Sequence, residues 1–330
     1  MTVWQLSTPV VFVIFNRPST AERVFEAIAK ARPPKLFVVA DGPRQDNPQD
    51  AAGCRASRGI IDLVDWDCDV VTDFAPDNMG LTLRFPTGLA KVFEHEEQAI
   101  ILEDDCLPHP QFFRFCEELL ERFRNDERVA QITGSNLQRG RNRTRDSYYF
   151  SRFTHIGGWA TWRRAWQTYD VQLSSWIDVR ETPWLHDVVG DARQERYWRR
   201  IFDRVVTGKQ DGWDYQWTYA CWRARALAAV PNVNLVSNIG YGRESSHTRL
   251  RSPLANIPMT AIDFPLRHPY AVAPNAAADA WTVKHVYKPF LPRMVAKARN
   301  DPWGLILQIR DEAGRRWSQA TPGSMSRRAP

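Results

Sequence analysis

Three consecutive acidic residues, Glu103, Asp104 and Asp105, follow directly on the apolar run AIIL at residues 99–102. Carboxylates this close to one another resist ionisation unless a cation or strong hydrogen-bond donors compensate their charge. Carboxylate oxygens are also the ligands that Mg²⁺ and Mn²⁺ prefer. We therefore expect a divalent-metal site here, with the positive charge supplied from outside the chain. The alternative is that Asp104 or Asp105 only caps the helix that follows.

A second group of candidate catalytic residues lies in the stretch KQDGWDYQWTYACW, residues 209–222. Asp214 stands between Trp213 and Tyr215, and burial among such rings raises a carboxyl pKa toward the range that suits a general base. Asp211 is the competing candidate. The simpler interpretation is an aromatic core helix with an acid near its N-terminus, where the helix dipole favours negative charge.

A third candidate is His247, in the stretch NLVSNIGYGRESSHT at residues 234–248. This polar, glycine-containing loop follows an apolar run, and an imidazole in it is suited to binding a phosphate or a metal. A single histidine in a loop is more often structural. Both interpretations stay open.

The elements that position these residues begin with a strand–helix–strand pattern. The runs PVVFVIF (9–15) and KLFVVA (35–40) are apolar and flanked by turn residues, as buried parallel strands are. Between them, STAERVFEAIAKA (19–31) has the apolar spacing of an amphipathic helix behind a Ser-Thr start. A further strand at 68–74 follows a helix around 51–63. This alternation predicts βαβ units and a mainly parallel sheet.

The remaining elements surround the acid triplet and then become less regular. A helix at 82–98 is predicted to carry Pro86 in its first turn, where proline is tolerated. The apolar run before the triplet is predicted to be a strand, and the segment from Pro110 a helix. Beyond residue 129, helices are predicted at 157–169, 195–205 and 213–227, and a strand at 232–240.

Polar residues follow three of these predicted strands. In open α/β sheets, ligands bind beyond the carboxyl ends of the strands. The residues suited to that edge are Asn16-Arg17, Asp41-Gly42 and the acid triplet. An Asp-Gly pair after a strand is by itself more often a turn. The three strand ends together predict where a ligand binds.

The composition is that of an ordinary globular chain: 330 residues, 43% hydrophobic and 25% charged. No apolar run approaches the roughly 18 to 20 residues that span a bilayer. Five cysteines without a CxxC pair predict a reduced, cytoplasmic protein without a disulfide framework. The helical spacing of Trp159, Trp162 and Trp166 favours core packing over stacking on sugar rings.

The positive charge of the chain is concentrated at its C-terminal end. Residues 281–330 hold ten Lys or Arg and three acidic residues, whereas the net charge of the whole chain is +6. The rest of the chain is therefore nearly neutral, which argues against nucleic acid as a partner. The basic tail predicts peripheral contact with the inner face of a membrane. A solvated, irregular end is the alternative.

The stretch ILEDDCLPHPQFFRF resembles the EDD signature of N-acetylglucosaminyltransferase I and of bacterial nucleotide-diphospho-sugar transferases with the GT-A fold. The likeness continues in order through VFVIFNRP, VVADGPR, NMGLTLRFPTGLAKVFE, GGWATWRRAW, WDYQWTYACW and PNVNLVSNIGYGRESSHT. It implies a GT-A catalytic domain at 1–250, with a nucleotide half at about 8–128 and an aromatic-rich acceptor half at about 129–250. Residues 251–330 would form a basic extension. The expected fold is a Rossmann-like mixed, mainly parallel sheet flanked by helices.

The resemblance further implies an inverting glycosyltransferase of surface-glycan biosynthesis, which moves a sugar from a nucleotide-diphospho-sugar to a glycan or lipid-linked acceptor. A UDP-sugar is favoured as the donor. Arg17 and Asp41 would hold the nucleotide base and ribose, and Glu103 and Asp104 would contact the donor sugar or the ribose. Arg84 stands where the family has a histidine near the diphosphate.

The resemblance also assigns the metal and the base. Asp105 would ligate Mn²⁺ or Mg²⁺, and Asp214 would be the catalytic base. The eukaryotic enzymes have a second acid where this chain has Tyr215, so Asp211 stays a competing candidate.

Two other functions stay open. A nucleotidyltransferase would be expected to have a Gly-rich loop with Arg and Lys after the first strand, where this chain has NRPST. A catalytically inactive module that binds a sugar-nucleotide or a glycan would keep the pocket without transfer. The intact triplet and Asp214 favour catalysis over such a module.

Overall fold

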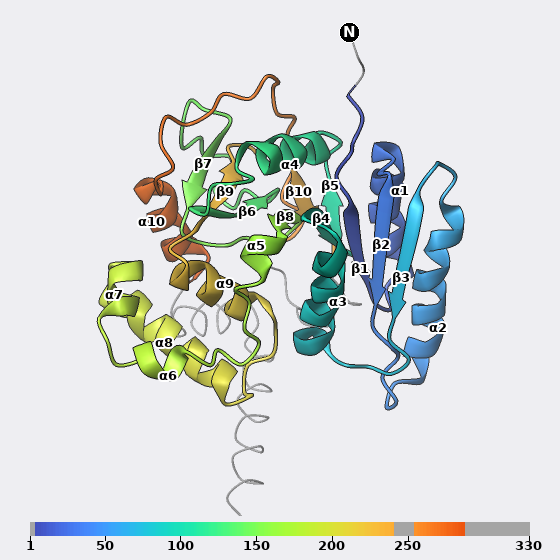
Figure 1. The fold of residues 1–330 in the computed structure, drawn as a ribbon, viewed down its shortest axis with the longest axis horizontal. Coiled ribbons are helices and arrows are strands. Elements are labelled where there is room, and N and C mark those ends of the chain that lie inside the picture. The colour runs from blue at the N-terminus through green and yellow to red at the C-terminus, as the bar shows by residue number, and fades with distance from the viewer. Residues whose placement is uncertain (1–3, 241–253, 288–330) are drawn as a thin grey trace, which may run out of the picture. The chain divides into compact units, whose positions relative to one another are not determined.

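The computed structural model describes residues 4–240 and 254–287 of the chain. Its described residues form a large sheet and a small one (Figure 1). The order across the large sheet is β3 (Asp69–Phe74), β2 (Lys35–Ala40), β1 (Val10–Ile14), β4 (Gln98–Glu103), β8 (Trp159–Trp162), β6 (Val129–Thr133), β9 (Leu227–Pro231) and β7 (Tyr148–Ser151). In the small sheet, β10 (Val236–Asn238) pairs antiparallel with β5 (Cys106–Pro108).

The pairing in the large sheet is mixed. Strands β3, β2, β1 and β4 are parallel neighbours, and so are β6 and β9. The edges of β8 pair antiparallel with β4 and β6, and β7 pairs antiparallel with β9. The predicted α/β class with a mixed, mainly parallel sheet flanked by helices is therefore confirmed.

Helices connect and cover these strands. In chain order they are α1 (Pro18–Ala31), α2 (Pro48–Arg58) with the 3₁₀ turn Gly59–Leu63, α3 (Leu81–His95), α4 (Gln111–Arg122), α5 (Arg163–Trp166), α6 (Trp176–Val179), α7 (Trp184–Val189), α8 (Ala192–Val206), α9 (Asp214–Arg223) and α10 (Ala276–His285). None of the described helices is long and apolar enough to cross a membrane.

The two faces of the sheet carry separate apolar cores. Side chains alternate along a strand, so neighbouring residues of β1 face opposite sides. Phe12 packs in a core with residues of α1 and α4, whereas Val11 packs in a core with residues of α3 and α9. Gly88 allows α3 to approach closely, because a Cβ there would lie 2.4 Å from Cγ1 of Val39. Packing on both faces of the sheet holds the strands, and therefore their carboxyl ends, in place.

Four of the predicted elements differ from the structure, and one of them is the strand predicted at 232–240, which forms β10 over Val236–Asn238 only. The helix predicted at 157–169 is instead β8 followed by the single turn α5. Trp159 and Trp162 are buried as predicted, but they are buried on a strand that pairs with β4 and β6, and this pairing overrides the local helical spacing. The helix predicted at 213–227 ends at Arg223, and Pro86 lies inside α3, beyond its first turn.

The C-terminal part of the described chain packs on the same body. The residues up to Thr282 form one compact unit, and Val283–Pro330 form a second one. Within the first unit, Ile262 and Leu266 lie in the core beneath β7, and the backbone of Ser147 donates to the carbonyl of Arg267. The predicted division into a catalytic domain and an extension at residue 250 is a functional one and stays a prediction. Most of the basic tail lies outside the described residues.

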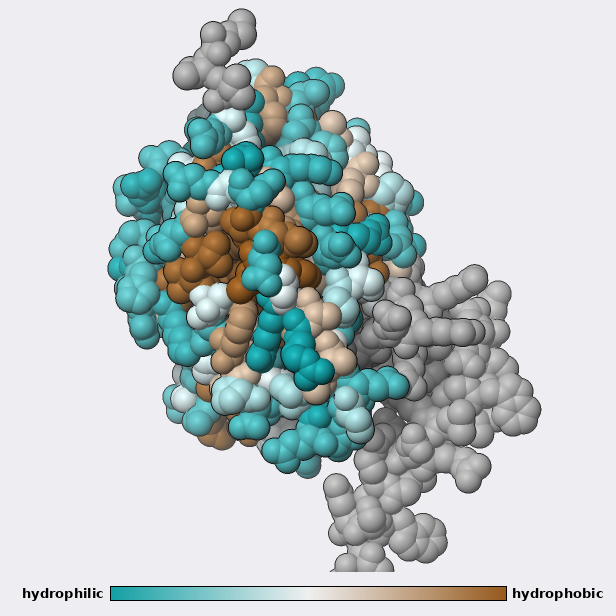
Figure 2. Space-filling model, turned by 90° about the vertical axis from the view of Figure 1, so that its right-hand side faces the viewer, coloured by the Kyte–Doolittle hydropathy of each residue, from teal (hydrophilic) through white to brown (hydrophobic). Residues whose placement is uncertain are grey.

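Strand β3 is an open edge of the large sheet. β3 has a neighbour on one side only among the described strands. Figure 2 shows an apolar area ringed by polar residues on the side of the molecule where β3 and α2 lie. Charged residues such as Asp69 and Asp73 on this strand are a common protection of a sheet edge against further pairing.

Candidate functional site

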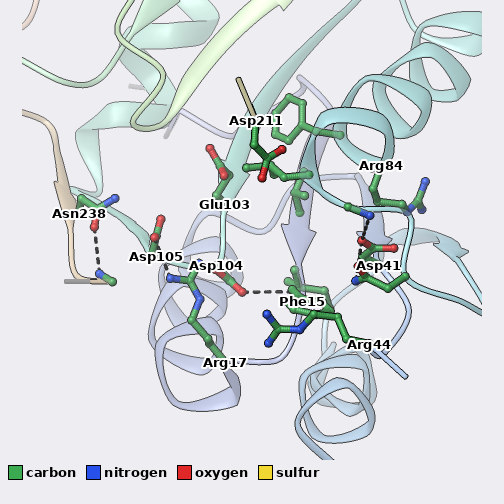
Figure 3. Close-up of a pocket in the computed structure, with 17 residues that line it drawn as sticks. Phe15, Arg17, Asp41, Arg44, Arg84, Glu103, Asp104, Asp105, Asp211 and Asn238 are labelled. Carbon is green, nitrogen blue, oxygen red and sulfur yellow. Dashed lines mark hydrogen bonds and ion pairs between the residues drawn. The ribbon is translucent and has the colours of Figure 1, made fainter. Parts of the chain in front are cut away.

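A cavity of about 340 Å³ lies at the carboxyl ends of β1, β2 and β4 (Figure 3). The start of α3, the loop before α9 and the end of β10 complete its walls. Seven of the residues predicted from the sequence line it, and they are Arg17, Asp41, Arg84, Glu103, Asp104, Asp105 and Asp211. The structure therefore brings these predicted residues to one place. His247 lies outside the described residues.

Arg17 meets two of the three acids of the triplet. Its Nη2 pairs with Oδ1 of Asp104, and its Nη1 lies 3.0 Å from Oδ2 of Asp105. The backbone N–H of Phe15 donates to the other oxygen of Asp104. The expectation that all compensating charge comes from outside the chain is therefore wrong for Asp104 and Asp105. The sequence could not reveal this pairing because Arg17 lies almost 90 residues before the triplet.

Glu103 is the acid of the triplet whose side chain has no direct partner among the described residues. Its side chain makes no hydrogen bond or ion pair with any described residue, and it lines the cavity half-buried. Burial raises its pKa well above the ordinary value, and the charges of Asp105 and Asp104 raise it further. A carboxylate in this position gains most from a ligand that brings hydroxyl donors or positive charge.

Asp41 is fully engaged by the chain itself. Its Oδ1 accepts hydrogen bonds from the backbone N–H groups of Gly42 and Met79, each at 2.9 Å. Its Oδ2 accepts from the N–H of Gly80 and from Nδ2 of Asn78, each at 3.0 Å. Asp41 therefore holds the loop that leads into α3 against the end of β2. Its predicted contact with the nucleotide stays a prediction.

Replacing Asp41 with Ala should lower the free energy of unfolding by about 1–3 kcal/mol, because the partly buried donors of the 78–80 loop lose their acceptor. Urea denaturation followed by circular dichroism measures the change. Asp46 is the matched control, since it lies in the same region, is exposed and bonds to no described residue. An Asp41→Ala variant as stable as Asp46→Ala would contradict this role for the carboxylate.

Arg84 braces α3 against the strands. Its side chain is almost completely buried, its Nε donates to the carbonyl of Ala40, and its Nη2 pairs with Oδ2 of Asp73 at 2.7 Å. In Figure 3 its guanidinium points away from the acid triplet. These contacts explain why an arginine is stable at this buried position. The predicted contact of Arg84 with a diphosphate stays a prediction.

The two candidate bases lie at the N-terminal side of α9, and Asp211 is among the residues that line the cavity whereas Asp214 is not. Asp211 lines the cavity, and its Oδ1 accepts hydrogen bonds from Oγ1 of Thr82 at 2.5 Å and from the N–H of Gly212 at 2.9 Å. Asp214 is the first residue of α9, and its negative charge contributes to the raised pKa of Glu103. Burial raises the pKa of Asp214 to about 6, although the backbone amides of the first helical turn lower it. A carboxylate with this pKa accepts a proton more readily than an exposed aspartate does.

The sequence did not single out two of the residues that form the opposite wall. Phe15, the last residue before Asn16-Arg17, lines the cavity, and the guanidinium of Arg44 lies 5.5 Å from the centre of its ring. Arg44 is held by the buried Asp50, with Nη2 3.0 Å from Oδ1. This wall is partly aromatic, and an aromatic ring of this kind can stack against a planar base. The signal was weak, because Phe15 continues an apolar strand pattern and Arg44 lies in a turn.

A divalent cation fits this cavity only if a bound ligand supplies part of its coordination shell. Among the described residues, no group of three or more His, Cys, Asp or Glu side chains is arranged to hold a metal ion. Asp105 nevertheless presents a carboxylate at the cavity wall, beside Glu103. Mg²⁺ and Mn²⁺ sites often take one or two protein carboxylates and complete the shell with phosphate oxygens and water. The residues present therefore suit a metal that arrives with a phosphorylated ligand.

Comparisons with known proteins add no family assignment. No family model and no curated protein matches the chain. Among solved structures, a UDP-glucose pyrophosphorylase complexed with UDP-glucose aligns over 49% of this chain and 79% of its own, with 10% identity and a TM-score of 0.30. An apo-UDP-glucose pyrophosphorylase aligns over 68% and 90%, with 9% identity and a TM-score of 0.35. The inositol-1-phosphate CTP transferase from T. maritima aligns over 69% and 86%, with 8% identity and a TM-score of 0.33. Similarities at this level do not assign a function.

Proposed function

We propose that the protein is a metal-dependent inverting glycosyltransferase, which moves a sugar from a nucleotide-diphospho-sugar to a hydroxyl group of a glycan or lipid-linked acceptor. The observation that carries the proposal is the arrangement of acids around the cavity. Glu103 and Asp105 lie on the strand side, and Asp211 lies on the α9 side of the same cavity. Asp214 is close enough for its charge to act on Glu103.

The chemistry of sugar transfer requires acids in such an arrangement. The acceptor hydroxyl must lose its proton as it attacks, so a carboxylate has to lie on the face of the sugar opposite the leaving group. Asp214 takes that role, and attack from its side inverts the anomeric centre. Glu103 hydrogen-bonds the donor sugar. Asp105 would hold the cation. A bound cation would neutralise the negative charge that develops on the leaving diphosphate.

The nucleotide is placed against the wall formed by Phe15 and Arg44. The base packs on this wall, near Asp41 and the 78–80 loop, and the diphosphate extends toward Arg17 and Asp105. A UDP-sugar is the favoured donor. The acceptor approaches from the aromatic half of the chain, and the basic tail contacts the membrane face at which a lipid-linked acceptor would be presented.

The test is to identify which products the protein forms from candidate sugar donors. The purified chain is incubated with UDP-, GDP-, ADP-, CDP- and dTDP-sugars and Mn²⁺, and the release of nucleoside diphosphate is followed. Release that requires Mn²⁺ supports glycosyl transfer to an acceptor or to water. Formation of a sugar-nucleotide and pyrophosphate from a sugar 1-phosphate and a nucleoside triphosphate would instead establish a nucleotidyltransferase.

An inactive binding module gives a third pattern. Ligand that binds only the folded state raises the melting temperature by mass action. A shift with one sugar-nucleotide, without turnover under any condition, would contradict the proposed transfer and support a binding module.

The rate of transfer should depend on the ionisation of Asp214. Because the pKa of Asp214 is raised to about 6, the carboxylate that accepts the proton is lost as the pH falls below that value. We expect kcat/KM to fall about tenfold per pH unit below pH 6 and to be level above it. A pH–rate profile between pH 4.5 and 8 measures this limb. A profile that is level down to pH 4.5 would contradict the assignment of the base.

A further inference from the structure

Arg17 forms ion pairs with two of the three carboxylates of the triplet. Its guanidinium spans Asp104 and Asp105, and the side chains of Arg17 and Asp105 are only 18% and 17% exposed. A fork with two parallel N–H groups is well suited to bridging carboxylates. Two of the three clustered acids are therefore paired with a side chain of the protein itself.

Gly240 closes this ion pair from the other side. A Cβ on Gly240 would lie 2.3 Å from Oδ2 of Asp105 and 2.7 Å from Nη1 of Arg17. The backbone N–H of Ile239 also donates to the carbonyl of Asp105 at 2.8 Å. The end of β10 therefore packs directly on the contact between Arg17 and Asp105. It leaves little space for a hydrated divalent ion beside the guanidinium.

We propose, resting on the function proposed above, that Arg17 is a built-in counter-cation of the metal site, which makes the binding of a divalent ion depend on a nucleoside diphosphate. A metal ion at Asp105 has to share or displace a positive charge that is already bound there. A diphosphate changes this balance, because it offers phosphate oxygens to the guanidinium and to the ion at the same time. Arg17 is a positioning residue in this scheme, and its release from Asp105 accompanies donor binding.

The test measures Mn²⁺ affinity directly, from the electron paramagnetic resonance signal of free Mn²⁺, with the full chain and without turnover. Without nucleotide, Arg17→Gln should bind Mn²⁺ at least about tenfold more tightly than the wild type, since a nearby charge changes such equilibria by this factor or more. Added UDP, or whichever nucleoside diphosphate binds, should tighten Mn²⁺ binding strongly in the wild type and less in the variant.

Two further variants keep the test decisive. Arg17→Lys keeps the charge, but its single ammonium group bridges two carboxylates less well, so it should give an intermediate gain even if Arg17→Gln fails to fold. Arg23→Gln removes a positive charge from an exposed position on α1, outside the cavity and the triplet, and its Mn²⁺ affinity without nucleotide should stay at the wild-type level.

The outcomes separate this inference from the proposed function. Wild-type Mn²⁺ affinity in both Arg17 variants, together with intact nucleotide-dependent Mn²⁺ binding in the wild type, would overturn the inference alone. Absence of Mn²⁺ binding in every variant and with every nucleoside diphosphate would overturn the metal site and the inference with it.

Discussion

Replacement of Asp214 with Asn should lower kcat by about 10²–10⁴-fold, the range that a positioned general base contributes, and should leave the affinity for the donor unchanged. Asn keeps the size of the side chain at the start of α9 but cannot accept the acceptor's proton. A loss in kcat without a change in donor binding identifies a group that acts in the transition state. Steady-state kinetics combined with calorimetric titration of the donor measures both quantities.

The matched control is Asp211→Asn, which changes the other candidate in the same way. Asp211 is bound to Oγ1 of Thr82 and to the N–H of Gly212, so its carboxylate is already engaged by the chain. We expect a much smaller loss of kcat in this variant. If Asp211→Asn loses transfer and Asp214→Asn retains it, the base is Asp211. Full activity in both variants would contradict a base on the α9 side.

Replacement of Asp105 with Ala should weaken Mn²⁺-dependent binding of the donor by on the order of 100-fold or more, since even the outer contacts of a metal site affect affinity by 10–100-fold. Asp105 lines the cavity, and its side chain is more exposed than that of Asp104, at 17% against 3%. Calorimetric titration of the donor, with Mn²⁺ and with a chelator, measures the metal-dependent part. The variant should bind the donor equally weakly under both conditions.

Asp211→Asn also serves as the control for this prediction. It removes one acid from the same cavity, so it tests whether a general loss of negative charge explains the result. We expect its metal-dependent donor binding to remain. An Asp105→Ala variant that binds the donor with full metal dependence would place the metal elsewhere. That result would leave the role of Asp214 untouched.

Local patterns in the sequence were enough for the first half of the fold. The strands β1, β2 and β4 are short apolar runs bounded by turn residues, and α1 has the apolar spacing of an amphipathic helix. Such patterns depend on neighbours within a few residues, so they can be recognised without the fold. The rule that ligands bind beyond the carboxyl ends of parallel strands then located the cavity.

The aromatic half was less predictable because its elements depend on partners far away in the chain. The tryptophans of the segment 159–162 have helical spacing. The segment nevertheless forms β8, because it pairs with β4 along one edge and with β6 along the other. Similarly, the helix α9 stops at Arg223, and Leu227 begins β9, which pairs with β6 and β7. Tertiary pairing decides such segments, and local spacing does not encode it.

The sequence by itself predicted several of the residues that line the cavity: the triplet Glu103-Asp104-Asp105, Arg17 and Asp41 all stand at or just after the end of a strand that local patterns reveal. Only the tertiary structure decided how these charges are shared. It pairs Arg17 with Asp104 and Asp105, ties Asp41 to the 78–80 loop, and leaves Glu103 without a partner among the described residues. The physical reason is that an ion pair requires two groups within a few ångströms, and folding brings such groups together from positions far apart in the chain.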